Sequence, residues 1–198
     1  MLSYLPDLAI DTSKIKAIMI NEVVADKAED DFYSNTGNSD YMKTTIPLFQ
    51  KAGADVQGID DILALGIYIT NMIKLPKQDT TVPREMIEKF VPILEEELSL
   101  FSSLCVVMLM GDVAKKGYNS IVKKQSGKNA VPSISTYKLR NSALTYKGIR
   151  IFPAYIMTGK NILIEKSKFE MSAEDIGKML ALIKSKRKSN TNQTKKKS

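Results

Sequence analysis

The chain contains no histidine and no tryptophan, and it has a single cysteine among its 198 residues. Without histidine it cannot build Ser-His or Cys-His nucleophilic systems, and it lacks a common ligand of zinc sites. One cysteine can form neither an internal disulfide nor a cysteine-ligated cluster. Since Cys105 heads an apolar run, we interpret it as a core residue. Any catalysis must therefore rely on carboxylates, amides, hydroxyls, lysines or backbone dipoles, and we expect no metal and no cofactor.

Long apolar segments and the two standard phosphate-binding motifs are also missing. No run approaches the roughly 20 apolar residues of a membrane helix, and no basic segment followed by an apolar stretch opens the chain. Neither a Walker-type Gly-Lys-Thr loop nor a Gly-x-Gly-x-x-Gly fingerprint is present. We expect a cytoplasmic monomer with no membrane partner, associated with the nucleoid if it binds DNA.

Positive charge is in excess, but its distribution along the chain is uneven. Seven of the 29 Lys and Arg residues lie in residues 184–198, which contain none of the 22 Asp and Glu residues. Residues 1–183 are therefore formally neutral, and we expect them to form one domain. We expect residues 184–198 to be a basic, disordered tail. Such a tail either attracts nucleic acid in a salt-sensitive way or is merely a solvated end.

Four short apolar runs alternate with stretches of helical spacing. Helices are predicted over 41–51, after Pro83, from Gly111 toward Lys124, and from the capping pattern Ser172–Asp175 to about residue 183. This alternation predicts an α/β fold, a single domain with a central, mainly parallel four-stranded sheet flanked by helices. The predicted strands are Ile15–Ile20, Gly66–Ile69, Cys105–Met110 and Gly148–Phe152.

Polar residues follow the first two of these runs. The first run is followed by Asn21 and Glu22, and the second closes on Thr70 and Asn71. Because the carboxyl ends of parallel strands meet at one edge of a sheet, a ligand site is expected there. The amide of Asn71 offers a donor and an acceptor in one plane, which matches the edge of a nucleobase. The alternative is an asparagine that caps the following loop.

Several segments together resemble the uracil-DNA glycosylase superfamily, most closely its thermophilic iron-sulfur branch. The resemblance covers residues 15–183 and depends on the order and spacing of four segments. Ile67–Lys74 is similar to that branch's strand with a Thr-Asn pair, and Val82-Pro83 to the start of its proline-started helix. Val106–Ala114 is similar to its apolar strand, and Tyr146–Pro153 to the segment that leads into its second motif.

The resemblance implies a role for individual residues. Glu22 occupies the position of the acidic residue that orients water, and Asn71 that of the base-reading asparagine. An aromatic residue between them would stack on the extruded base, with Tyr33 as the first choice and Tyr41 as the second. Alternatives are an ion-paired loop carboxylate for Glu22 and a core position for Tyr33.

The second motif departs from the family pattern. Ile156 and Met157 stand where the family has a His-Pro pair, and the cysteines that bind the iron-sulfur cluster are absent. Backbone N–H groups of the following turn, or its lysine, are the candidates to replace the histidine in stabilising the leaving base. That turn occupies the place of the loop that presses into the DNA minor groove, and it consists of Thr158, Gly159, Lys160 and Asn161.

The function implied is hydrolysis of the N-glycosidic bond of uracil or another deaminated base in DNA, as in base excision repair. The expected partner is DNA that contains such a base. One alternative is a nucleobase or nucleic-acid binder of the same fold that is non-catalytic or has altered specificity, which the lost histidine favours. A hydrolase of free nucleosides is a third possibility.

Overall fold

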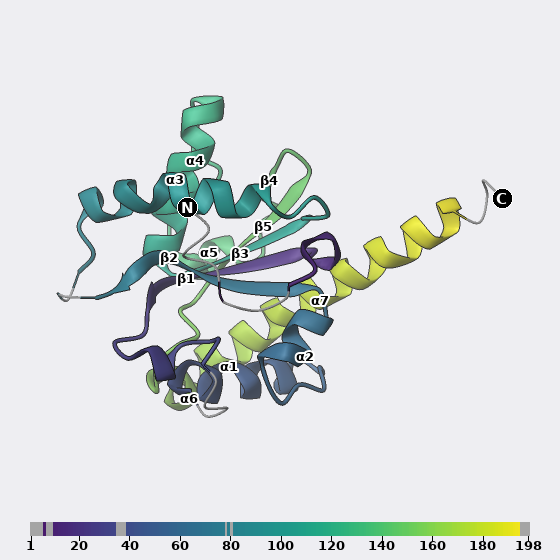
Figure 1. The fold of residues 1–198 in the computed structure, drawn as a ribbon, viewed down its shortest axis with the longest axis horizontal. Helices are drawn as coiled ribbons and strands as arrows, with labels where there is room; N and C mark the ends of the chain where they lie inside the picture. Colours follow the sequence, from purple (N-terminus) through teal and green to yellow (C-terminus); the bar gives the residue numbers. More distant parts are fainter. Residues whose placement is uncertain (1–5, 7–9, 35–38, 78, 80, 195–198) are drawn as a thin grey trace.

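Five strands form a single sheet in the order β2-β1-β3-β5-β4 (Figure 1). The computed structural model describes residues 6, 10–34, 39–77, 79 and 81–194. Strand β1 pairs in parallel with β2 and β3, and β3 pairs in parallel with β5. The predicted α/β class, with one domain and a mainly parallel sheet, is therefore confirmed. The strands are β1 (Ala17–Val24), β2 (Ile67–Pro76), β3 (Val106–Met110), β4 (Thr145–Tyr146) and β5 (Ile149–Ala154).

Helices cover both faces of the sheet. Helices α3, α4 and α5 lie on one face, and α1, α2, α6 and α7 lie on the other, with α7 projecting away from the body (Figure 1). Single 3-10 turns at Thr12–Lys14 and Ala28–Asp30 flank β1. The helices are α1 (Asp40–Lys51), α2 (Ile59–Ala64), α3 (Arg84–Ser99), α4 (Asp112–Ser126), α5 (Thr136–Leu139), α6 (Asn161–Ile164) and α7 (Lys166–Thr194).

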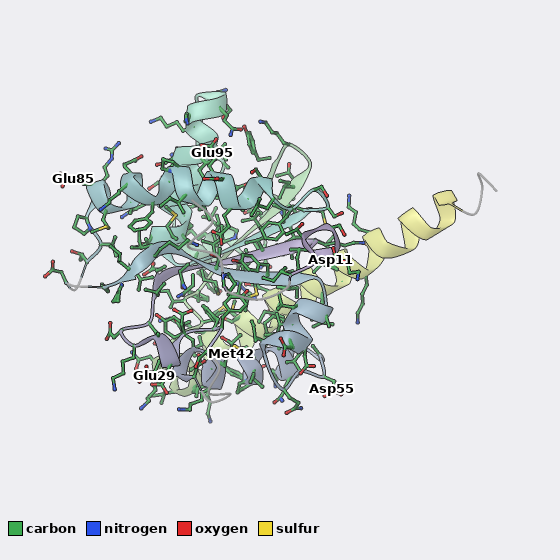
Figure 2. The ribbon with its side chains drawn as sticks, viewed as in Figure 1. Asp11, Glu29, Met42, Asp55, Glu85 and Glu95 are labelled. Carbon is green, nitrogen blue, oxygen red and sulfur yellow. The ribbon has the colours of Figure 1, made fainter. Side chains whose placement is uncertain are left out.

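Alternation along the strands divides the core into two layers. Ala17 and Met19 of β1 contact the α1 and α7 layer, whereas Ile18 and Ile20 contact the α3 and α4 layer. Since helices cover both faces of the sheet, both faces of β1 are buried, which explains its continuous apolar run. Polar contacts support the second layer. Glu95 of α3 reaches α4, where it accepts a hydrogen bond from Gln125 Nε2 at 2.8 Å (Figure 2).

The sheet has one strand more than the sequence predicted. Strand β4 is two residues long and pairs antiparallel with the start of β5. The hairpin turn that joins them has φ values of 48° at Lys147 and 79° at Gly148. Two successive residues with positive φ form the tight turn that suits the twist of a hairpin. So short a strand has no hydrophobic alternation of its own, which is why its sequence pattern does not reveal it.

Strand β2 continues past the polar pair at which the sequence predicted it to close. Thr70 and Asn71 lie within it, and it ends only at Pro76. Buried partners make this possible, because Glu97 of α3 accepts hydrogen bonds from Thr70 Oγ1 at 2.8 Å and from Lys74 Nζ at 2.7 Å. The Lys74–Glu97 ion pair is almost fully buried, and Tyr68 also donates to Glu97. Polar residues in a strand therefore do not end it when the adjacent helix satisfies them.

Helix α7 differs from its prediction at both ends. It begins at Lys166, so that Ser172 lies buried inside the helix and not at its cap. The carboxylate of Asp175 instead forms two hydrogen bonds with the buried guanidinium of Arg140, at 3.1 and 3.0 Å. At the other end the helix continues into the basic segment as far as Thr194. Lysine and arginine are good helix formers, and no glycine or proline interrupts this stretch. The last tail residues, 195–198, lie outside the described residues.

Candidate functional site

The carboxyl edge of the sheet brings together the elements that the sequence singled out. Asn21 of β1 stands opposite Asn71 of β2 in the parallel register, with Glu22 next in β1. The turn after β5 reaches the same edge, because Thr158 Oγ1 donates a hydrogen bond to Asn21 Oδ1 at 3.2 Å. The carboxyl-terminal halves of β1 and β2 and the turn after β5 are thus joined by hydrogen bonds, at the side of the sheet where an open α/β fold binds its ligand.

Glu22 and Asn71 nevertheless point to opposite faces of the sheet. Successive side chains in a strand alternate between faces, so Asn21 shares the α1 and α7 face with Met19, while Glu22 shares the α3 and α4 face with Ile20. Asn71, in register with Asn21, lies on the α1 and α7 face. The two residues expected to act on one base are therefore separated by the sheet edge.

Glu22 is held at the N-terminus of α4. The backbone N–H of Val113 donates to Glu22 Oε1 at 3.0 Å. The helix N-cap is Gly111, which has no side chain to satisfy this donor, and the partial positive charge of the helix end favours a carboxylate there. Gly111 has a φ of 92°, and a Cβ atom on it would lie 2.7 Å from Ile156 Cγ1 and closer still to Glu22 Oε1. A residue without a side chain is therefore required between Glu22 and Ile156.

Glu22 lines a cleft of about 390 Å³ between α4, α5 and the segment after β5. Ile156, Thr158 and Asn161 line the same cleft, so the structure brings four of the residues discussed from sequence into one wall. Lys168 of α7 adds a positive charge, which is paired with Glu165. In the described part of the chain, Glu22 Oε2 has no hydrogen-bond partner, which leaves this oxygen available to a ligand or a water molecule.

Asn71 belongs to a chain of side-chain hydrogen bonds and does not line that cleft. Asn21 Nδ2 donates to Asn71 Oδ1 at 2.8 Å, and Asn71 Nδ2 donates to both oxygens of Asp31 at 3.3 Å. Asn21 is 1% exposed and Asn71 is 6% exposed. Both the donor and the acceptor of the Asn71 amide are thus engaged within the protein. To bind a base, Asn71 would have to exchange at least one of these partners.

Tyr33 lies along the outer edge of β2. Its hydroxyl donates to the carbonyl oxygen of Ile69 at 2.8 Å and accepts from the backbone N–H of Ile69 at 3.2 Å. Because β2 is an edge strand, these backbone groups have no strand neighbour, and the tyrosine satisfies them. Burial raises the pKa of the Tyr33 phenol well above its usual range. Its ring contacts Tyr68 at 5.8 Å between centroids.

Tyr41, Gly159 and Lys160 line a separate hollow of about 780 Å³ on the α1 and α7 side of the edge. Tyr41 donates to the carbonyl oxygen of Val23 at 3.0 Å, and its ring contacts that of Phe32 in a tilted arrangement, with 5.0 Å between centroids. Burial raises the pKa of Tyr41 to about 12. The turn 158–161 thus separates two cavities, with Thr158 and Asn161 on the Glu22 side and Gly159 and Lys160 on the Tyr41 side.

Sequence reasoning missed three residues of this edge, namely Asn21, Asp31 and Lys168. The signal for Asn21 was available, because an asparagine near the end of one apolar run matches Asn71 at the end of the next. No comparable pattern marks Asp31, whose carboxylate accepts backbone hydrogen bonds from Ala25 at 2.8 Å and Phe32 at 2.7 Å. These bonds hold the loop after β1 in place.

The described residues contain no group of three or more His, Cys, Asp or Glu residues suited to hold a metal ion. No helix in this part of the chain has the length and apolar character needed to cross a membrane. In comparisons with known proteins, neither a protein-family model nor a curated protein matches the sequence.

Proposed function

We propose that this protein is a glycosylase-like hydrolase that cleaves the N-glycosidic bond of uracil or another deaminated base in DNA, with Glu22 orienting the attacking water. The observation that carries the proposal is the anchored carboxylate of Glu22 in the cleft beside the Thr158–Asn161 turn. One oxygen is fixed by the α4 N-terminus, so the other is held in a defined place toward the cleft. A carboxylate so placed can orient water and stabilise a cationic sugar, as in glycoside hydrolysis.

The leaving base requires stabilisation that histidine cannot supply in this chain. Thr158 is engaged with Asn21, and Lys160 lies in the hollow on the other side of the turn. Lys168 is the cation placed in the wall of the Glu22 cleft, 5.9 Å above the centre of the Tyr155 ring. We propose that Lys168 offsets the negative charge of the leaving base. Loss of one such stabilising group typically costs about 10²- to 10³-fold in turnover, so a slow enzyme is expected.

The test is incubation with single-stranded DNA that contains uracil, hypoxanthine or xanthine, followed by quantification of abasic sites. Glu22→Gln should abolish product while DNA binding stays near that of the unmodified protein, because the amide keeps an acceptor for Val113. Asp112→Asn is the matched control, since its carboxylate lines the same cleft but is 75% exposed and paired with Lys115. Full activity in the Glu22→Gln variant would remove Glu22 from the mechanism.

A second function, binding of a nucleobase or nucleic acid without catalysis, is favoured by one observation. The apolar Ile156 stands next to Glu22 across Gly111, where a proton donor to the leaving base would be expected. Specific binding of a uracil-containing strand with no abasic sites in any of the three substrates would support this function over hydrolysis.

A further inference from the structure

A groove with a volume of about 840 Å³ lies beside the Glu22 cleft. It runs between α4, the start of α3 and the segment 129–137. Asp112, Thr136 and Tyr155 line both the groove and the Glu22 cleft, so the two cavities are continuous. A chain-like ligand in the groove would therefore reach Glu22.

Side-chain hydrogen bonds hold one wall of this groove in place. The Asn119 amide donates to the carbonyl oxygen of Val131 at 2.8 Å and accepts from its N–H at 2.9 Å, as a neighbouring strand would do. Lys115 of α4 donates to Thr136 Oγ1 at 3.3 Å. These bonds fix the segment 129–137 against α4. The groove is thus a formed feature of the fold.

The groove presents unpaired positive charge along one helix face. Four polar residues of α4 line the groove at the i, i+3, i+4, i+7 spacing of a single helix face, namely Lys116, Asn119, Ser120 and Lys123. Among the side chains that the structure describes, none forms an ion pair or hydrogen bond with the ammonium group of Lys116 or Lys123, and both lysines are exposed. The two lysines are two turns apart, about 10 Å along the helix.

The acidic residues of the groove are already neutralised. Glu88 accepts a hydrogen bond from Ser120 Oγ at 3.0 Å and lies 3.8 Å from Arg84 Nε. Asp112 pairs with Lys115 at 2.6 Å. The net charge available to a ligand is therefore positive, although the domain as a whole is formally balanced.

Exposed apolar side chains lie beside these charges. Tyr137 is 67% exposed and Ile134 is 50% exposed, and both line the groove. An aromatic ring in the same groove as lysines suits a nucleobase that stacks while its phosphates are bound. In a duplex the bases are stacked on one another, so an aromatic platform of this kind favours a single strand.

We propose that this groove binds single-stranded DNA, with Lys116 and Lys123 contacting phosphates and Tyr137 stacking on a base. Continuity with the Glu22 cleft makes the same strand the substrate track of the proposed hydrolase. The role of the groove as a substrate track rests on the proposed function, whereas the binding of single-stranded DNA does not.

The experiment measures fluorescence anisotropy of a labelled thymidine oligonucleotide of about 12 nucleotides, without a deaminated base, at several salt concentrations. Each phosphate contact to a single strand contributes about 0.7 to the slope of log affinity against log salt, so replacing both Lys116 and Lys123 by alanine should lower that slope by about 1.4. Lys89→Ala is the matched control, because Lys89 is an exposed lysine of α3 that does not line the groove.

Tyr137→Ala should weaken binding about 5- to 150-fold, and Tyr137→Phe should retain it. All these side chains are exposed, so circular dichroism and thermal unfolding should match the unmodified protein. The proposal is overturned if the double-lysine variant keeps the original slope, if Tyr137→Ala binds normally, or if duplex DNA of the same length binds as tightly as the single strand. Glu22→Gln should bind the unmodified oligonucleotide normally. A loss of catalysis with intact binding would therefore count against the proposed hydrolase alone.

Discussion

Replacing Gly111 by alanine should displace the Glu22 carboxylate and destabilise α4. The backbone of Gly111 has φ 92° and ψ 179°, a conformation that residues with a side chain rarely adopt. The added Cβ would also collide with Glu22 Oε1 and with Ile156 Cγ1. Because Glu22 Oε1 accepts the Val113 N–H, its movement would leave the helix N-terminus without this partner.

The expected magnitude follows from these two effects. A side chain forced into this backbone region costs about 1 to 3 kcal/mol, and loss of a capping acceptor costs about 0.5 to 2 kcal/mol. The free energy of unfolding should therefore fall by about 1.5 to 5 kcal/mol in Gly111→Ala. Gly127, the C-cap of the same helix, is a control with φ 74° and no atom within 4 Å of an added Cβ. Gly127→Ala should lose only the backbone contribution, about 1 to 2 kcal/mol.

Urea unfolding of a double-mutant cycle separates the two effects. Glu22→Ala alone removes the capping acceptor, so Gly111→Ala in that background cannot remove it again. The double variant should be less destabilised than the sum of the single variants by about 0.5 to 2 kcal/mol. Abasic-site formation should be lost in both single variants, since each takes the carboxylate away from its place. Additivity within about 0.5 kcal/mol, or equal effects of Gly111→Ala and Gly127→Ala, would refute the reasoning.

Three further predictions concern the edge and its support. In anisotropy titrations, Asn71→Ala should weaken binding of a uracil-containing strand by about 1 to 3 kcal/mol and leave binding of an undamaged strand unaffected. Equal weakening for both strands, or the same pattern in Asn21→Ala, would indicate a structural role for Asn71. Glu97→Gln should lower the free energy of unfolding, measured with urea, by about 3 to 5 kcal/mol, because it leaves the Lys74 charge buried and unpaired. Adding Lys74→Met should recover most of this loss, and no recovery would contradict the ion-pair explanation. Burial raises the pKa of the folded-state Tyr41 phenol to about 12, so as pH rises the unfolded state loses the phenol proton first. The contribution of Tyr41 to the free energy of unfolding is therefore present below about pH 10 and is lost as pH rises toward 12. Tyrosinate absorbance at about pH 11 should therefore be equal in the native protein and in native Tyr41→Phe, and should differ by one tyrosine in denaturant.

Local patterns in the sequence determined the elements that place the site. The apolar runs predicted the four parallel strands, because a strand buried on both faces is continuously apolar. Pro83 predicted the start of α3, which begins at Arg84, and Gly111-Asp112 predicted the start of α4. These signals act between residues close in the chain. They could be interpreted without knowledge of any partner.

Partners distant in the chain decided the rest. Asn21 meets Asn71 across 50 residues, and Arg140 meets Asp175 across 35, so neither pair has a local signature. Glu97, 27 residues away in α3, allows β2 to continue through Thr70. Where such polar side chains find buried partners, the cost of burying them is offset, and an element extends past the point where its local pattern ends.

The placement of Glu22 and Asn71 shows most clearly what the local sequence determined and what the tertiary structure decided. The sequence determined that both lie near the carboxyl ends of parallel strands, and therefore at one edge of the sheet. Only the register between β1 and β2, which pairs Asn71 with Asn21, decided that Glu22 points to the other face. Since side chains alternate with a period of two, a shift of one residue in pairing would have placed both side chains on the same face of the sheet. That register is set by packing of the two core layers, which no local stretch of sequence contains.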